Sequence, residues 1–213
     1  PLGIKLQIPP IPKLMQSNLS WKPTTGLKLL SIGRLTYYKG FETLIRAVQD
    51  MQGVELLIAG EGELCEALEA LILATTTTNT APAVKLVGNV NDGEKHALLR
   101  NCDVFCLASR ERTEAFGVVL LEAMQHRRPC IVSDLPGSGM PWVIAQARAG
   151  LPVPLEDLEG WRSTIARLQH NPRMRTQMGE AGHRALMERF RIERCERELA
   201  KHYRQLGTQG LPK

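Results

Sequence analysis

The fold class is decided by residues 28–60, which read KLLSIGRLTYYKGFETLIRAVQDMQGVELLIAG. Short apolar runs at 28–32 and 54–59 flank a segment, 41–51, in which apolar residues recur with the period of a helix. The two runs end at Gly33 and Gly60, and neither alternates with polar residues, which is typical of strands buried on both faces. This stretch therefore predicts a strand, a crossover helix and a second, parallel strand.

The same alternation continues along the chain. Further strands are predicted at 84–87, 103–108, 129–132 and 151–153. Helices are predicted at 64–74, 94–100, 117–125, 142–147, 158–168, 172–188 and 192–206, with loops at 75–78 and 137–139. The pattern is typical of an α/β protein with a Rossmann-like parallel sheet of about six strands and helices on both faces. We expect a proline-rich lead-in or linker at 1–26, a domain at 27–206 and a flexible tail at 207–213.

Composition narrows the class of protein. The chain has 213 residues, 43% hydrophobic and 23% charged, which excludes a disordered or fibrous protein. No apolar run approaches the roughly 18 residues that a membrane-spanning helix needs. The five cysteines are scattered and form no CxxC pair, which favours a reduced, cytoplasmic protein. The chain begins with Pro1 rather than Met, so we expect a fragment of a longer protein, for which peripheral contact with the inner face of the membrane is an option.

The basic charge raises nucleic acid as a partner, but its location argues against one. The chain holds 27 Lys and Arg against 22 Asp and Glu, a net charge of +5. Residues 161–204 hold 11 basic and 5 acidic side chains, whereas residues 1–160 hold 15 and 17. Interleaved charges in C-terminal helices indicate a solvated face or a domain contact. A nucleic-acid-binding module is therefore the least favoured alternative.

The loop after the first strand carries two cations. Ligands of parallel sheets bind beyond the carboxyl ends of the strands, so these loops are the candidate sites. In Gly33-Arg34-x4-Lys39-Gly40, the glycine permits close backbone approach, Arg34 suits phosphate oxygens and Lys39 precedes a helix N-terminus. Taken alone, the loop is better explained as two solvated surface cations.

The loop after the 103–108 strand carries two carboxylates. Glu114 and Glu122 are eight residues apart, and a helix predicted from Gly117 directs its free N–H groups to the space between them. A phosphate fits at such a terminus, with a sugar beside Glu114 and a ribose diol beside Glu122. A charge at Glu122, between Leu121 and Ala123 in an apolar helix, is costly without a partner, which favours a functional role over a plain surface residue.

The loop after the second strand gives a weaker signal. Gly60-Glu61-Gly62 forms half of a dinucleotide fingerprint, but Cys65 stands where the third glycine belongs. The neighbouring acidic side chains also repel a pyrophosphate. We interpret this loop as a turn that lines a pocket.

Together, Arg34-x4-Lys39 and Glu114-x7-Glu122 resemble the C-terminal, donor-binding domain of a GT-B retaining glycosyltransferase of family 4, also called glycosyl transferases group 1. The resemblance implies that Arg34 and Lys39 hold the donor diphosphate, that Glu114 contacts the donor sugar and that Glu122 binds the ribose. Arg34, Lys39 and Glu114 are the implied catalytic residues. The other implied donor-binding residues are Gly33, Gly60, Glu61, Gly88, Asn89, Val90, Ser109, Phe116, Gly117, Val118 and Val119.

Two departures from the family pattern are visible. The usual glycine before the 129–132 strand is replaced by Arg127-Arg128, and the usual Gly-Gly-x-x-Glu after it is replaced by the sequence at 136–143, PGSGMPWV. The second variant resembles a subgroup that acts in bacterial polysaccharide and O-antigen assembly, with GDP- or UDP-sugars as donors. No DxD-like motif stands in a candidate loop, so we expect no metal and no cofactor besides the nucleotide-sugar co-substrate.

The resemblance predicts retaining transfer of a hexosyl group to a glycan or lipid-linked acceptor. The partner is the N-terminal acceptor domain of the same protein, without which this fragment is expected to be inactive. The alternative is a GT-B-type sugar-nucleotide epimerase or phosphosugar enzyme, which shares the phosphate loops and needs an additional acid or base.

Overall fold

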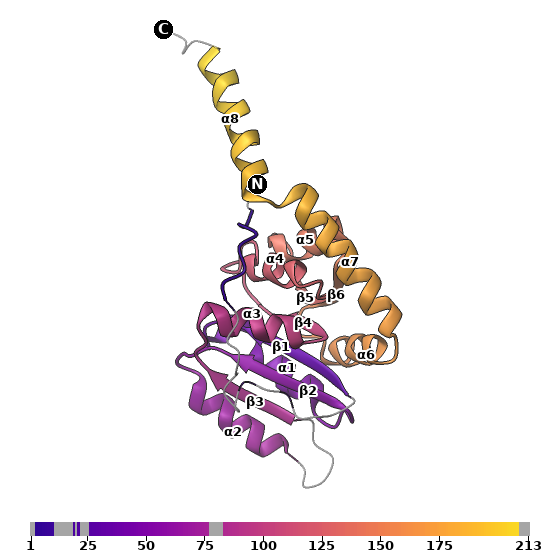
Figure 1. Ribbon diagram of the computed structural model, residues 1–213. Coiled ribbons are helices and arrows are strands. Elements are labelled where there is room, and N and C mark those ends of the chain that lie inside the picture. The colour runs from indigo at the N-terminus through magenta and orange to yellow at the C-terminus, as the bar shows by residue number, and fades with distance from the viewer. Residues whose placement is uncertain (1–2, 11–18, 20, 22–25, 77–82, 209–213) are drawn as a thin grey trace.

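The structure of the protein is a computed structural model that describes residues 3–10, 19, 21, 26–76 and 83–208. Its strands form one six-stranded parallel sheet (Figure 1). The strands are β1 (Leu27–Ile32), β2 (Val54–Ala59), β3 (Ala83–Gly88), β4 (Val104–Leu107), β5 (Cys130–Asp134) and β6 (Gly150–Pro154). The helices are η2 (Tyr37–Lys39), α1 (Phe41–Val48), α2 (Cys65–Thr75), α3 (Asp92–Asn101), α4 (Val118–Gln125), α5 (Gly139–Ala147), α6 (Leu158–Gln169), α7 (Pro172–Arg189) and α8 (Ile192–Thr208).

The strand order, β3-β2-β1-β4-β5-β6, locates the expected ligand site. In this order the chain reverses direction across the sheet between β1 and β4, and ligands of doubly wound sheets bind at that switch point. The loops that follow β1 and β4 are the ones in which the sequence places Arg34, Lys39 and Glu114. The predicted fold class is confirmed.

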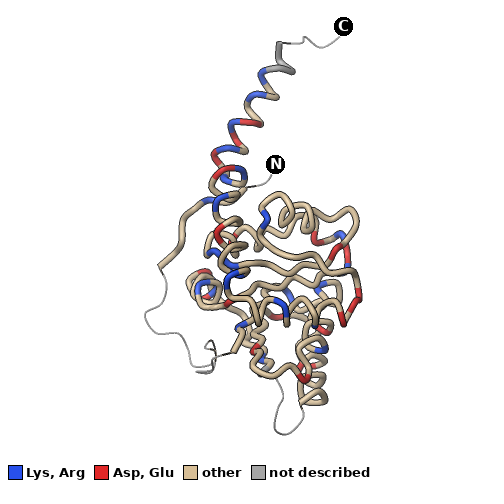
Figure 2. The backbone as a smooth tube through the Cα atoms, turned by 90° about the vertical axis from the view of Figure 1, so that its right-hand side faces the viewer, with Lys and Arg blue, Asp and Glu red and all other residues tan. Residues whose placement is uncertain are grey.

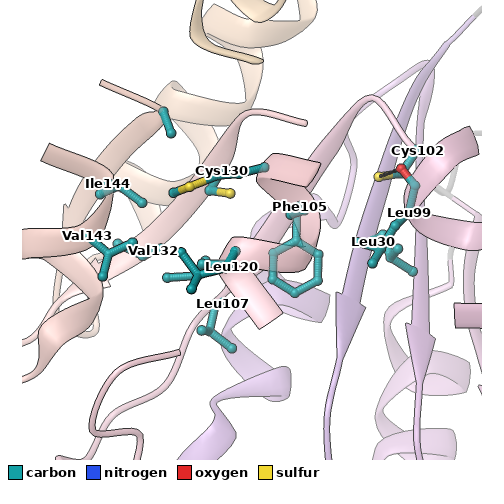
Figure 3. Packing of buried hydrophobic residues seen from close by; sticks show 14 of the residues in the cluster. Leu30, Leu99, Cys102, Phe105, Leu107, Leu120, Cys130, Val132, Val143 and Ile144 are labelled. Atoms are coloured by element: carbon teal, nitrogen blue, oxygen red, sulfur yellow. Dashed lines mark hydrogen bonds between the residues drawn. The ribbon is translucent and has the colours of Figure 1, made fainter. Parts of the chain in front are cut away.

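Two apolar cores cover the two faces of the sheet. One unites the sheet with α3, α4, α5 and α7, and Figure 3 shows part of it, in which Phe105 of β4 packs among residues of neighbouring elements. The other unites the sheet with α1, α2 and α6, and contains the fully buried Trp161. The continuous apolar strand runs follow from this arrangement, because both faces of each central strand are buried.

Helix ends differ from the sequence predictions by a few residues for local reasons. The helix predicted at 41–51 ends at Val48, because Gln49 leaves the helical region at ψ 133° and Asp50 then turns into the left-handed region. The segment 137–139, predicted as a turn, includes the first residue of α5, since Ser138 caps that helix through Met140 N–H. The loop predicted at 75–78 begins one residue later, because Thr75 closes α2. Residues 77 and 78 lie outside the described residues.

The start of the described chain lies beside the start of α8. The backbone N–H of Ile4 donates to Phe190 O at 3.0 Å, and Ile192 N–H donates to Ile4 O at 3.2 Å. From there α8 projects away from the sheet, with Leu199 and Tyr203 exposed (Figure 1). Figure 2 shows basic and acidic residues interleaved along this helix. α8 runs through Thr208, into the predicted tail, and residues 209–213 lie outside the described part. The lead-in or linker predicted at 1–26 also falls largely on residues outside the described part of the chain.

None of the described helices is long and apolar enough to cross a lipid bilayer. All five cysteines are free thiols, and Cys102, Cys106 and Cys130 are buried. Burial raises the pKa of the Cys102 thiol to about 12, so it stays protonated at neutral pH. Cys106 is fully buried in the core on the other face of the sheet, where its thiol serves packing.

Candidate functional site

Three glycines pack the loops at the carboxyl ends of β1, β2 and β3 against each other. Gly33 N–H donates to Ala59 O at 3.0 Å, and Gly60 N–H donates to Gly88 O at 2.8 Å. At Gly60, φ is +144°, and a Cβ would lie 1.9 Å from the carbonyl oxygen of Gly33. A side chain at this position is therefore excluded by backbone, and the three loops form one floor at this edge of the sheet.

Lys39 and Glu114 form an ion pair across the switch point. They are 75 residues apart in sequence, and the Lys39 Nζ contacts Glu114 Oε2. Their side chains are only 12% and 14% exposed. A Cβ at Gly33 would lie 3.3 Å from Lys39 Nζ, so this glycine leaves room for the lysine. The structure thus unites Gly33, Lys39 and Glu114, three of the residues predicted for the site.

The start of α5 holds the loop that carries Glu114. The Ser138 hydroxyl donates to Glu114 O at 2.8 Å, and Gly139 N–H donates to Ala115 O at 2.7 Å. Near the start of the same loop, Arg110 Nη2 donates a hydrogen bond to Glu42 Oε2 of α1 at 3.2 Å. These supports were missed by the sequence reasoning. Ser138 carried one signal, because a serine before a helix is a typical N-cap.

Arg34 lies at the same edge but outside the ion pair. Its side chain is exposed, and within the described part of the chain it forms no hydrogen bond or ion pair. The neighbouring backbone is fixed, since Leu35 N–H donates to Glu61 O at 2.9 Å. The guanidinium therefore retains its five N–H donors for a ligand. Its predicted role in phosphate binding stays a prediction.

Glu122 has a partner that the sequence reasoning did not single out. Lys95 of α3 donates to Glu122 Oε1 at 2.8 Å and contacts Asp92 at 3.1 Å. Burial alone would lower the pKa of Lys95. The hydrogen bonds and negative charges of Glu122 and Asp92 outweigh the effect of burial, so the pKa of Lys95 is raised overall. Lys95 is therefore charged at neutral pH. One carboxylate oxygen of Glu122 is engaged, and the side chain is still 20% exposed.

The N-terminus of α4 lies between the two glutamates in the sequence. The helix begins at Val118, with Gly117 as its N-cap at φ +71°. Glu114 pairs with Lys39 of η2, and Glu122 pairs with Lys95 of α3, so the two carboxylates do not contact each other. The hydroxyl of Ser109, at the end of β4, is buried without a hydrogen-bond partner among the described residues. In the first turn the N–H groups of Val118 and Val119 bond no described residue and are available to an anion, whereas Leu120 N–H donates to Gly117 O at 2.8 Å.

The remaining predicted residues lie at the same carboxyl edge. Glu61, Asn89 and Val118 are exposed, and Val90, Phe116 and Val119 are partly buried. Gly88 has φ +75°, and a Cβ there would meet no atom within 4 Å. The described residues contain no group of three or more His, Cys, Asp or Glu arranged to hold a metal ion.

A partly buried histidine pair connects α3 with the end of α4. His96 Nδ1 and His126 Nε2 are 2.7 Å apart. Burial lowers the pKa of both rings, with His96 and Arg128 adding to the effect at His126, whose pKa falls to about 4. The folded protein therefore favours neutral rings. In the unfolded chain a histidine binds a proton near pH 6.5. The contribution of the neutral pair to the free energy of unfolding is therefore fully present above pH 6.5 and is lost as the pH falls from 6.5 toward 4.

We expect the melting temperature to fall between pH 7 and pH 5, and the fall to be smaller in His126→Gln. His170→Gln, at an exposed histidine, serves as the control and should keep the wild-type pH dependence. Thermal unfolding followed by circular dichroism measures this. An identical pH dependence in His126→Gln and wild type would show that the pair does not cause it.

Comparison with known proteins places this chain in a family. A sequence model described as glycosyl transferases group 1 matches residues 16–185. The chain belongs to this family. The lipopolysaccharide core biosynthesis glycosyltransferase LpsE of Rhizobium meliloti (strain 1021) is 30% identical over 171 residues, which cover 80% of this chain and 48% of that protein. The match confirms the resemblance that the Arg/Lys and Glu-x7-Glu patterns indicated.

Solved structures of similar fold extend the comparison. Sucrose-phosphate synthase from Thermosynechococcus elongatus is 25% identical with a TM-score of 0.79, over 99% of this chain and 52% of that one. Anabaena Alr3699/HepE, solved in complex with UDP-glucose, is 18% identical with a TM-score of 0.73, over 85% of this chain and 49% of that one. The chain spans about half the length of the relatives it matches. The prediction of one half of a GT-B fold is confirmed.

Proposed function

We propose that this group 1 glycosyltransferase chain binds the nucleotide-diphosphate sugar from which a hexosyl group is transferred. The observation that carries the proposal is the Lys39–Glu114 pair at the switch point of the sheet, beside the start of α4. Family membership supports it, as does the fold shared with a protein solved with UDP-glucose. The donor base is a uracil or guanine in this proposal.

The diphosphate is bound by Arg34, Lys39 and the first backbone N–H groups of α4. Lys39 carries three N–H donors, so it can bind phosphate oxygens while one donor stays on Glu114. Arg34 is exposed and unengaged within the described chain, which suits a residue that closes on the ligand. Backbone amides at Phe116, Gly117, Val118 and Val119 complete the anion site.

The two glutamates recognise the two sugars of the donor. Glu114 has a second carboxylate oxygen that accepts from a hydroxyl of the transferred sugar, and Glu122 keeps one for the ribose while Lys95 holds the other. Gly88, Asn89 and Val90 lie along the nucleobase, with Gly60 and Glu61 on the same side. Ser109 lies at the end of the central strand β4.

In the proposed reaction the bond between the anomeric carbon and the diphosphate oxygen breaks, and the acceptor oxygen forms the new bond on the same face of the sugar. The proton of the acceptor hydroxyl passes to the leaving diphosphate. Negative charge develops on the leaving diphosphate, and in this proposal Arg34, Lys39 and the α4 N-terminus stabilise it. We therefore propose a retaining transfer that needs no metal ion and no further cofactor.

The acceptor in this proposal is a glycan or a lipid-linked sugar of bacterial polysaccharide assembly. The similarity to a lipopolysaccharide core enzyme supports it. An N-terminal domain of the longer protein binds this acceptor, in the cytoplasm or at the inner face of the membrane. The chain alone is expected to bind donor but not to catalyse transfer.

Product analysis of the longer protein tests this function. With a panel of UDP- and GDP-sugars and a lipid-linked acceptor, we expect one donor to give a new glycosidic bond with the donor's anomeric configuration, measured by NMR. An epimerase of the same architecture would instead isomerise the nucleotide sugar without an acceptor. Inverted configuration in the product would contradict the retaining mechanism but leave donor binding intact.

A further inference from the structure

A charged cavity lies at the edge of the sheet opposite the donor loops. Its volume is about 590 Å³, and it includes Asp103, just before β4, and Pro129, just before β5. The end of α3, the turn after α4 and the first turns of α7 form its other walls. Four arginines line it against two carboxylates: Arg100, Arg127, Arg128 and Arg175 against Asp103 and Glu180.

Helix ends fix two of these guanidiniums in place. Arg128 Nη2 donates to Arg100 O near the end of α3, and Arg175 Nη1 donates to Leu168 O and Gln169 O at the end of α6. These bonds place a positive charge at the negative C-terminal ends of two helices. Each guanidinium has five N–H groups, and the bonds use at most two of them. The Nε of Arg128 is buried with no partner in the described residues.

The two carboxylates offset only two of the four positive charges. Asp103 Oδ2 accepts from the backbone N–H of Lys28 at 2.9 Å, and Glu180 pairs with Arg127 at 3.1 Å. Arg100, Arg128 and Arg175 form no ion pair with any described residue. Three guanidinium groups that form no ion pair therefore share the cavity with Asp103, and helix ends hold two of them, those of Arg128 and Arg175.

We propose that this cavity binds a phosphate group, carried by a soluble phosphate ester or by a lipid headgroup. Planar guanidinium groups bind phosphate oxygens in a bidentate way, and two of them are held in place by the protein before the ligand arrives. The cavity lies at the amino ends of the strands, whereas the donor binds at the carboxyl ends. The proposal is therefore independent of the donor site.

Arg127 offers a substitution that removes charge without harming the fold. It follows α4 in the left-handed region, at φ +55°, where glycine is favoured. Arg148 follows α5 in the same conformation, at φ +50°, is exposed and does not line the cavity. Arg127→Gly and Arg148→Gly therefore form a matched pair, in which both relieve the backbone and only the first changes the cavity.

The test is a calorimetric titration of the chain with pyrophosphate, in an Arg34→Ala background that weakens the donor site. We expect Arg127→Gly and Arg175→Gln each to reduce affinity by about fivefold to tenfold, since each removes a charge-assisted hydrogen bond. Arg148→Gly in the Arg34→Ala background should bind pyrophosphate as tightly as Arg34→Ala alone, because the cavity and the residual donor site are the same in the two proteins. Equal affinities in Arg127→Gly and Arg148→Gly would overturn the proposal.

Vesicle sedimentation separates the two sources of the phosphate. Binding to phosphatidylglycerol vesicles but not to phosphatidylcholine vesicles, reduced in Arg127→Gly and displaced by pyrophosphate, assigns the cavity to a lipid headgroup. Pyrophosphate binding that depends on Arg127, without vesicle binding, assigns it to a soluble phosphate ester. An absence of any Arg127-dependent binding in both assays rejects the site.

Discussion

Lys39→Ala is expected to weaken the binding of UDP or GDP by about 10- to 100-fold, the usual effect of losing a charge-assisted hydrogen bond to phosphate. Lys39 is the cation that the fold holds at the switch point, in contact with Glu114 and next to Gly33. Its loss removes charge from the diphosphate subsite and leaves the Glu114 carboxylate there to repel the ligand. Isothermal titration calorimetry of the chain measures the affinity directly.

Glu114→Gln is the matched control for that experiment. It removes the partner of Lys39 but keeps the shape of the side chain, so it should bind the bare nucleoside diphosphate at least as tightly as wild type. It should also lose the preference for the nucleotide sugar over the nucleotide, because its carboxylate recognises sugar hydroxyls in the proposed site. Wild-type affinity in Lys39→Ala, with the fold confirmed by circular dichroism, would remove Lys39 from the site.

Gly60→Ala is expected to destabilise the fold by about 2–4 kcal/mol, the combined range for backbone strain and overpacking. The added Cβ would lie 1.9 Å from Gly33 O, a backbone atom that cannot move aside without shifting the β1 loop. Because that loop carries Arg34 and Lys39, nucleotide affinity should fall as well. Urea unfolding gives the change in the free energy of unfolding.

Gly88→Ala isolates the conformational part of this effect. Gly88 also has a positive φ, +75°, but a Cβ there meets no atom within 4 Å. We expect a cost of about 1 kcal/mol, from the left-handed backbone alone. If both alanine variants lose the same stability, steric contact between the β1 and β2 loops is not what requires a glycine at position 60.

The architecture was predictable because it depends on local patterns. Strands buried on both faces appear in the sequence as continuous apolar runs, as at 54–59, and each predicted strand lies within two residues of an observed one. The helix ends were less predictable. The start of α3 at Asp92 depends on reciprocal hydrogen bonds between Asn91 and Glu94, and apolar periodicity does not register such caps.

The site was predictable where topology alone brings residues together. The loops after β1 and β4 must meet at the switch point, so Lys39 and Glu114 were expected at one edge although 75 residues separate them. The partnership of Glu122 with Lys95 was not predictable, because it depends on how α3 and α4 are rotated and offset when they pack. The same holds for the contact between His96 and His126.

Titration of the chain with UDP, GDP and ADP tests the central claim, that the switch point is a nucleotide-diphosphate site. We expect UDP or GDP to bind, and Arg34→Ala and Glu122→Ala each to weaken that binding while the folded state is retained. If none of the three nucleotides binds the folded chain, or if both variants bind like wild type, the assignment of the donor site is wrong.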